Sequence, residues 1–99
     1  MTMKFEWDER KNWINIRNHG LDFADANEMF NGLMVVKLDS RFDYGEERWI
    51  GIGLAGGVIC AVVVYVEREE VIRIISFRKA DRYERESFER EIKNGLGTG

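Results

Sequence analysis

The pattern of apolar and polar positions divides the chain into short elements. Apolar residues at helical spacing predict helices over residues 8–18, 22–31 and 80–94. Runs rich in β-branched and aromatic residues predict strands over residues 4–7, 33–38, 48–54 and 58–66, and a last strand from Val71 that gives way to the final helix through Arg78 and Lys79. Asp8 and Asp22 are suited to cap the first two helices, and Gly20 is suited to end the first.

The order of these elements predicts the fold class. A strand and two helices are followed by four strands and a helix, so helices and strands do not alternate regularly. The last three strands are joined by short turns and are expected to form an antiparallel meander, with the doubly apolar strand 58–66 in the middle of the sheet. We therefore predict one α+β domain over residues 1–99, an antiparallel sheet with helices on one face and a frayed tail at 95–99.

Composition and charge narrow the classes of function. The 99 residues carry a net charge of −3, which argues against a general nucleic-acid binder, although the part of the chain from Trp49 onward is neutral overall. One histidine and one cysteine cannot supply the usual ligand set of a zinc site, so neither a metal nor a cofactor is expected. No apolar run is long enough to cross a bilayer, and no signal peptide opens the chain, which predicts a cytoplasmic protein without membrane contact.

Cationic side chains gather where the last strand meets the last helix. Arg73, Arg78, Lys79 and Arg82 are candidates for an anion site, because guanidinium groups bind phosphate through two parallel hydrogen bonds and stay charged at any physiological pH. The alternative is that Arg73 pairs with a carboxylate on a neighbouring element. Strand alternation places Arg73 and Arg78 on opposite faces, so a shared site requires a bulge near Ser76 or a position of Arg78 beyond the strand end.

Two further residues are candidates for proton transfer. Glu84 lies on the sheet-facing stripe of the last helix, where it is either a structural counter-ion of the arginines or a general base whose pKa they tune. His19 stands near the carbonyl end of the first helix, where a structural role against the helix dipole and an acid/base role are both open.

Several segments together resemble one protein family. They are Phe5-x-Trp7-Asp8 with Lys11 and Asn15; Asn18-His19-Gly20 with Phe23, Ala26 and Phe30; Arg48-x-x-Gly51; and Ile72-Arg73-Ile74-Ile75-Ser76-x-Arg78-Lys79-Ala80 followed by Glu84-Arg85. In this order and at these spacings they resemble the BrnT family, toxins of type II toxin-antitoxin systems with a RelE-like ribonuclease fold. One departure is Asn18, a position at which the family more often has lysine.

The resemblance implies a function, partners and site residues. It implies an endoribonuclease that stops translation, is neutralised by a BrnA-type antitoxin with a ribbon-helix-helix domain, and binds operator DNA only as a complex with that antitoxin. By this resemblance Arg73 and Arg78 come first as functional positions, and Arg48, Ser76 and Lys79 follow. The full set of candidate site residues is Arg73, Arg78, Arg48, Glu84 and His19 for catalysis, and Ser76, Lys79 and Arg82 for substrate binding.

A ribonuclease built from these residues would use the 2′-hydroxyl of its RNA substrate as the nucleophile. The arginines would then stabilise the dianionic phosphorane, and Glu84, His19 or Lys79 would carry protons. Two other interpretations stay open. One is a non-catalytic binding module whose arginines fasten an acidic partner segment, and the other is a degenerate toxin that keeps the fold without the activity.

Overall fold

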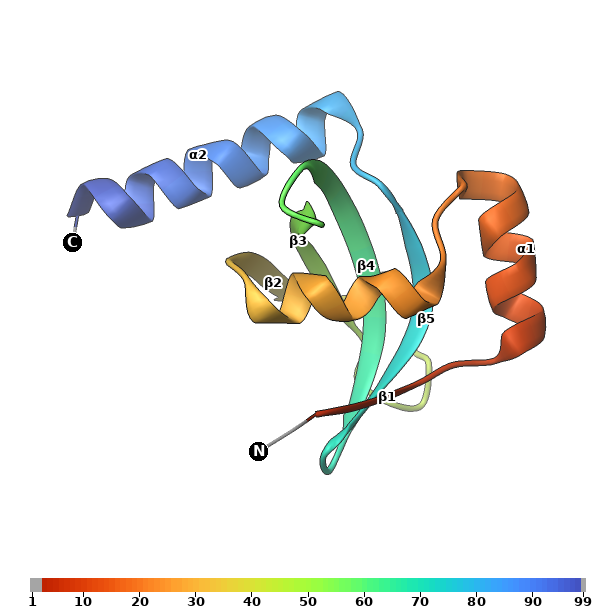
Figure 1. Cartoon of the computed structure of the whole chain (residues 1–99). Helices are drawn as coiled ribbons and strands as arrows, with labels where there is room; N and C mark the ends of the chain where they lie inside the picture. The colour runs from red at the N-terminus through yellow and green to blue at the C-terminus, as the bar shows by residue number, and fades with distance from the viewer. Residues whose placement is uncertain (1–2, 99) are drawn as a thin grey trace.

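The structure is a computed structural model that describes residues 3–98, with side chains as far as Gly95. Its elements are β1 (Lys4–Glu6), α1 (Glu9–His19), the 3₁₀ helix η1 (Phe23–Asn31), β2 (Met34–Leu38), β3 (Trp49–Ala55), β4 (Ile59–Arg68), β5 (Val71–Lys79) and α2 (Arg82–Thr98) (Figure 1). The predicted order of elements is confirmed. The last helix runs to Thr98, beyond the expected end at Asn94, and Gly99 lies outside the described residues. The fraying expected for residues 95–99 stays a prediction.

The five strands form one sheet in the order β1-β5-β4-β3-β2. Strands β2 to β5 are a continuous antiparallel meander, which confirms the predicted pairing and the central place of β4. The expectation of a wholly antiparallel sheet is wrong at one edge, because β1 pairs parallel to β5, with Glu6 opposite Arg73. The chain reaches this edge at its start and returns to it only with the last strand, which runs in the same direction.

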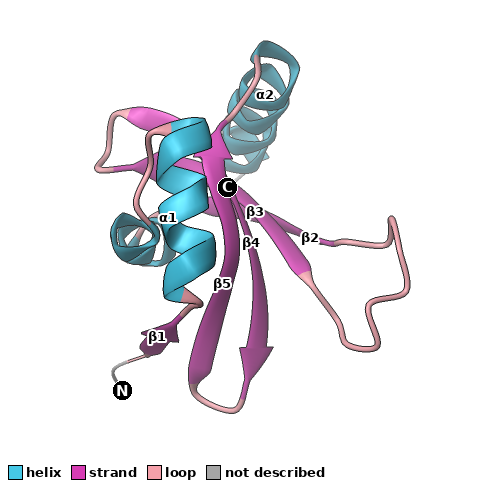
Figure 2. Ribbon diagram, turned by 90° about the vertical axis from the view of Figure 1, so that its right-hand side faces the viewer, coloured by secondary structure: helices cyan, strands magenta, loops and turns pink. Residues whose placement is uncertain are grey.

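Two apolar clusters cover the two faces of the sheet. Phe23, Ala26 and Met29 of η1 pack against one face, whereas Phe88 of α2 packs against Ile52 and Val62 on the other. The prediction that all helices lie on one face is therefore wrong, as η1 and α2 sit on opposite sides of the strands (Figure 2). The cause lies in β4, whose alternate residues are apolar in both directions. We call the side that bears α2 the α2 face.

A bulge in β5 decides which of its side chains share a face. Val64 of β4 stands opposite Ser76 and the next residue, Tyr65, stands opposite Ile74, so Ile75 has no partner. The extra residue reverses the alternation of β5. Arg73, Ser76 and Arg78 therefore all project from the α2 face, as a shared site requires, and the predicted bulge near Ser76 is confirmed.

The edge of β5 beyond β1 is closed by α1. The buried side chain of Asn15 donates a hydrogen bond from Nδ2 to the Phe77 carbonyl oxygen (2.7 Å) and accepts one at Oδ1 from the Phe77 N–H (3.3 Å). It thereby replaces a neighbouring strand for the residue between Ser76 and Arg78. Within residues 3–98, no helix is both long and apolar enough to cross a membrane.

Candidate active site

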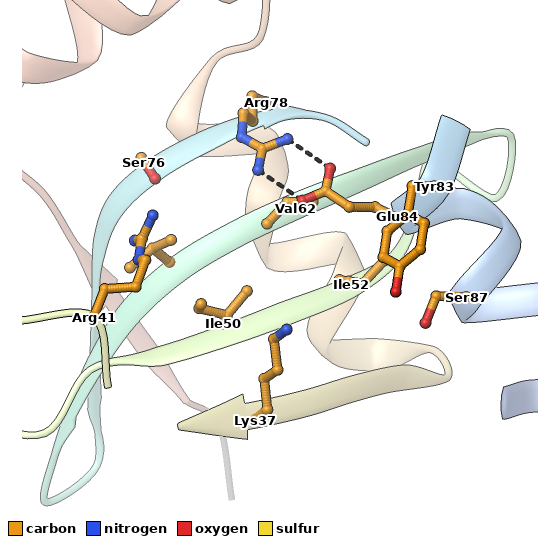
Figure 3. Close-up of a pocket in the computed structure, with 11 residues that line it drawn as sticks. Lys37, Arg41, Ile50, Ile52, Val62, Ser76, Arg78, Tyr83, Glu84 and Ser87 are labelled. Carbon is orange, nitrogen blue, oxygen red and sulfur yellow. Dashed lines mark hydrogen bonds and ion pairs between the residues drawn. The ribbon is translucent and has the colours of Figure 1, made fainter. Parts of the chain in front are cut away.

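A pocket of about 260 Å³ opens on the α2 face, between the sheet and the first turn of α2. Figure 3 shows side chains from β2, β3, β4, β5, α2 and the loop 39–48 around it. Its lining residues are Lys37, Arg41, Ile50, Ile52, Val62, Val64, Ser76, Arg78, Tyr83, Glu84 and Ser87. We call this the arginine pocket, because two arginines stand above its apolar floor.

Arg78 is held in the pocket by Glu84. Its two terminal nitrogens, Nη1 and Nη2, each donate a 2.8 Å hydrogen bond to Oε1 and Oε2 of the carboxylate, a bidentate arrangement that is among the stronger polar contacts in proteins. The guanidinium lowers the pKa of Glu84 to about 2 and the carboxylate raises the pKa of Arg78. Both groups are therefore fully ionised at neutral pH.

Glu84 also caps the helix that carries it. Its Oε1 accepts the Asp81 N–H at 2.9 Å, while the Asp81 carboxylate accepts the Glu84 N–H at 2.7 Å. This reciprocal pair is a capping box, which satisfies two backbone donors that a helix start leaves free. One carboxylate thus fixes the beginning of α2 and the direction of Arg78.

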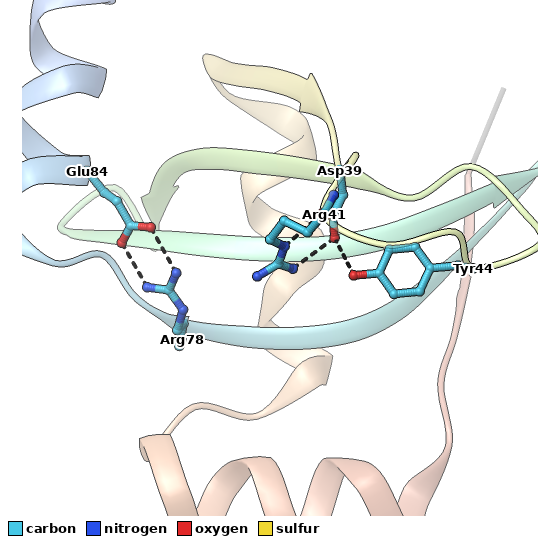
Figure 4. Close-up of polar contacts among 5 residues, drawn as sticks. All are labelled: Asp39, Arg41, Tyr44, Arg78 and Glu84. Carbon is cyan, nitrogen blue, oxygen red and sulfur yellow. Dashed lines mark hydrogen bonds and ion pairs between the residues drawn. The ribbon is translucent and has the colours of Figure 1, made fainter.

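Arg41 approaches the pocket from the opposite side. Asp39, almost fully buried, accepts hydrogen bonds of 2.8 Å from Nε and Nη2 of Arg41, and Tyr44 donates a third at 3.3 Å. These donors hold the pKa of Asp39 far below its usual range. Both guanidinium groups point into the same space (Figure 4). The positive charge of Arg41 therefore acts to lower the pKa of Arg78, against the larger opposite effect of Glu84.

The rest of the pocket supplies polar groups around the two guanidinium ions. Lys37 extends from β2 toward the pocket, and its charge contributes to the low pKa of Glu84. Tyr83 lines the α2 side of the pocket and is 76% exposed. Ser76 and Ser87 bring hydroxyl groups from the sheet and from α2. The arrangement can bind a phosphate between two cations and offers groups that carry protons nearby.

Two of the other candidate residues lie on the same face but outside this pocket. Arg73 stands opposite Val66 of β4, whereas Arg78 stands opposite Val62, four residues away. Nη1 of Arg73 donates a 2.6 Å hydrogen bond to the carboxylate of Glu6. The predicted alternative, a carboxylate partner for Arg73 on a neighbouring element, is therefore confirmed. Arg48 directly precedes β3 and its guanidinium stacks on the Tyr44 ring, 4.0 Å from the centroid.

The remaining candidates lie elsewhere. Lys79 is exposed at the end of β5, one position beyond Arg78, and alternation directs it to the opposite face. Arg82 is exposed on α2 and pairs with Glu86 at 3.0 Å. His19 lines a separate hollow with Lys11 and Ile75, so the pocket does not include it.

Sequence reasoning missed Lys37, Arg41 and Tyr83. Lys37 is the one charged residue in a strand that is otherwise apolar, the same signal that drew attention to Arg73. Lys37, Asp39 and Arg41 also continue the alternation of β2 beyond its end, where the sequence predicts only a polar turn. Tyr83 gave no signal beyond its place on a predicted helical stripe.

The pocket and the sheet that carries it define a small α+β protein with two carboxylate-oriented arginines at a pocket on one open face. A family model described as "Ribonuclease toxin, BrnT, of type II toxin-antitoxin system" matches residues 7–84. The chain therefore belongs to the BrnT family, and the resemblance seen in its sequence is confirmed.

One solved structure illustrates the relationship. The chain is 35% identical to the ribonuclease toxin BrnT of Brucella abortus, whose crystal structure at 1.1 Å superposes with a TM-score of 0.64 over 82% of this chain and 100% of that one. No curated protein sequence matches the chain.

Proposed function

We propose that this chain is a metal-independent endoribonuclease that cleaves RNA in the arginine pocket and so stops translation. The observation that carries the proposal is that Arg41 and Arg78, from opposite sides of one pocket, are each oriented by a carboxylate toward the same space. Two fixed guanidinium groups bind a phosphodiester and stabilise the charge that it gains during cleavage. Membership of a family of ribonuclease toxins supports RNA as the substrate.

The reaction that these residues support is attack of the RNA 2′-hydroxyl on the adjacent phosphorus. The bond from phosphorus to the 5′-oxygen breaks and a 2′,3′-cyclic phosphate forms. Arg41 and Arg78 would bind the two non-bridging oxygens, whose negative charge grows in the transition state. Their preorganisation matters because no reorientation is then needed at the moment of reaction.

The proposal assigns proton transfer to groups inside the pocket. Glu84 with a pKa of about 2 is a weak base while Arg78 holds it. A phosphate that takes over Arg78 removes the main cause of that low pKa, so the released carboxylate becomes a stronger base for the 2′-hydroxyl proton. Lys37 and Tyr83 line the same pocket and carry protons for the leaving 5′-oxygen.

The proposed partner is a BrnA-type antitoxin with a ribbon-helix-helix domain. Type II toxins are by definition bound by a protein antitoxin, and the family places this chain among them. We propose that the antitoxin covers the arginine pocket, and that operator DNA is bound only by the complex, in the cytoplasm. The net charge of −3 supports the view that the toxin alone is not the DNA-binding component.

The experiment compares growth arrest and RNA cleavage for the wild type, Arg41→Ala and Arg78→Ala. Each purified protein is first shown to be folded by circular dichroism and then assayed on RNA in excess EDTA. Arg10→Ala is the matched control, because Arg10 is an exposed arginine of α1. We expect the wild type and control to cut RNA, and both pocket variants to lose at least about 100-fold in kcat, as for the loss of one electrostatic donor.

A second candidate function is a binding module without catalysis. The observation that favours it is that Arg78 and Arg41 are already paired with Glu84 and Asp39. If folded wild-type protein leaves RNA intact with and without divalent metal, and cells continue to grow, this candidate replaces the ribonuclease. Cleavage that EDTA abolishes would instead contradict metal independence alone.

A further inference from the structure

A second group of arginines lies on the α2 face, away from the arginine pocket. Arg73 stands opposite Val66 of β4, and Arg68 follows on the same face of that strand. Arg48 directly precedes β3, whose first residue, Trp49, stands opposite Tyr65 of β4. All three act on Glu46, whose pKa is lowered by Arg68 first and then by Arg48 and Arg73. We call Arg48, Arg68 and Arg73 the second arginine cluster.

The second arginine cluster keeps one donor that none of its carboxylates uses. Arg68 pairs with Glu46 and Arg73 pairs with Glu6. Within residues 3–98, Arg48 forms no ion pair of its own, and its buried Nε has no hydrogen-bond partner. Buried donors normally have partners, so the Nε–H of Arg48 is an unused donor of the cluster. Glu69 is a third carboxylate and lines the same hollow as Arg68 and Arg73.

The two cation groups are aligned along the strands. Arg78 stands opposite Val62 and Arg73 opposite Val66, which separates the two rows by about 13 Å at roughly 3.3 Å per residue. Ser76, opposite Val64, lies between them on the same face. The bulge at Ile75 creates this alignment, because it brings Arg73 onto the face of Arg78.

From this placement we infer that the second arginine cluster is a subsite for the backbone phosphates of single-stranded RNA whose scissile phosphate lies in the arginine pocket. The inference rests on the proposed function. A flexible strand of phosphates can follow a line of guanidinium groups along β5, and each contact contributes charge-assisted hydrogen bonds. The exposed ring of Tyr83 beside the pocket favours unpaired bases, which stack on aromatic side chains.

Arg48 and Arg73 are catalytic candidates by sequence, and the inferred subsite gives them a different role. It makes them substrate-binding residues and leaves Arg41 and Arg78 to the reacting phosphate. The difference is measurable, because a residue that binds only a distant phosphate affects long substrates and not short ones.

The experiment uses two substrates. A dinucleoside monophosphate has one phosphate and fills only the arginine pocket, whereas a ten-nucleotide single-stranded RNA also reaches the second arginine cluster. For Arg48→Ala and Arg73→Ala, we expect kcat/KM on the ten-nucleotide RNA to fall about tenfold, which corresponds to about 1.4 kcal/mol. The loss should lie in KM, and cleavage of the dinucleoside monophosphate should not change.

Glu6→Gln separates binding from a structural role of Arg73. This variant frees Arg73 from its carboxylate but keeps the arginine. If Arg73 only fastens β1 to β5, Glu6→Gln and Arg73→Ala should impair the protein alike. If Arg73 binds phosphate, Glu6→Gln should lower KM for the ten-nucleotide RNA while Arg73→Ala raises it.

Some results would overturn the inference, and another would contradict the proposed function alone. Equal losses in kcat on both substrates would make Arg48 and Arg73 catalytic, and no loss on either would remove the subsite. If the wild type cuts neither substrate, the proposed function fails. The subsite is then tested by the Kd of a 2′-O-methyl ten-nucleotide RNA, which should rise about tenfold in Arg48→Ala but not in Arg10→Ala; an unchanged Kd would reject it.

Discussion

Arg78 and Glu84 are joined by two parallel hydrogen bonds of 2.8 Å, and the same carboxylate accepts the Asp81 N–H at the start of α2. One side chain therefore serves both a helix terminus and a cation in the pocket. Any anion that binds Arg78 must compete with Glu84. Without a ligand, Arg78 is therefore correctly oriented but already paired with the Glu84 carboxylate. The affinity of the pocket for phosphate is the difference between the free energies with which Arg78 binds phosphate and binds Glu84.

The variant Glu84→Gln tests this competition. Glutamine also suits the capping box, so the start of α2 should persist while the ion pair with Arg78 is lost. We expect the affinity for a 2′-O-methyl RNA to rise about tenfold, since a hydrogen bond to a charged group is worth about 1.5 kcal/mol or more. If Glu84 is the base, kcat falls at least about 100-fold. Glu86→Gln, on the exposed side of α2, is the matched control, and unchanged binding would contradict the model.

The low pKa of Glu84 predicts a dependence of stability on pH. The group has a pKa of about 2 in the folded state against an ordinary value of 4.5. Because the folded pKa is depressed, its contribution is complete above about pH 4.5 and is lost as pH falls toward 2. Urea titrations from pH 7 to pH 2.5 should show the gap in unfolding free energy between wild type and Glu84→Gln narrowing by about 2 kcal/mol. A gap that stays constant would mean that the ion pair does not stabilise the fold.

Asn15 predicts a stability effect at a distance from the pocket. In Asn15→Ala both backbone groups of Phe77 lose their partner inside the core, and an unsatisfied buried group costs about 1–3 kcal/mol. We expect the unfolding free energy to fall by about 2–4 kcal/mol, measured by urea denaturation. Asn18→Ala, at an exposed position of the same helix, should change it by less than about 0.5 kcal/mol. Equal effects of the two variants would contradict the bridging role.

Two glycines of β3 are expected to differ in their tolerance of alanine. A Cβ at Gly53 would lie 2.9 Å from the Leu33 carbonyl oxygen, which is backbone, whereas one at Gly51 would meet the flexible end of Met34 at 2.7 Å. Gly53→Ala should therefore cost about 1–3 kcal/mol through displaced backbone, and Gly51→Ala less than about 1 kcal/mol. Thermal denaturation of the two variants measures the difference, and the reverse order would show that β2 moves more easily than Met34.

The sequence predicted the elements well because its periodic signals are local. The caps Asp8 and Asp22 accept backbone N–H groups as expected, and β4 is apolar on both faces as a central strand requires. The partner of β1 and the side taken by α2 were not predictable in this way. The partner of β1 depends on which edge of the meander is free, and the side taken by α2 depends on which apolar face is left uncovered once η1 has packed. Both are properties of the assembled sheet.

The candidate site was predicted only in part, for a similar reason. Ser76, Arg78 and Glu84 are close in the chain, and the pocket brings them together. Lys37 and Arg41 come from β2 and the loop after it, and only the pairing of β2 with β3 brings them to the same pocket. His19 attracted interest through its residue type alone, and it lies in another hollow.

The unpaired residue Ile75 has a consequence for insertions and deletions in β5. Arg73 and Arg78 are an odd number of positions apart, so a regular strand would turn one of them toward the hydrophobic core. Deletion of Ile75 would leave the two arginines four positions apart, a spacing at which a regular strand keeps both on the α2 face without a bulge. The shared face therefore depends on spacing and bulge together: a one-residue insertion or deletion that kept the bulge would turn one arginine toward the core, whereas loss of Ile75 together with the bulge would not.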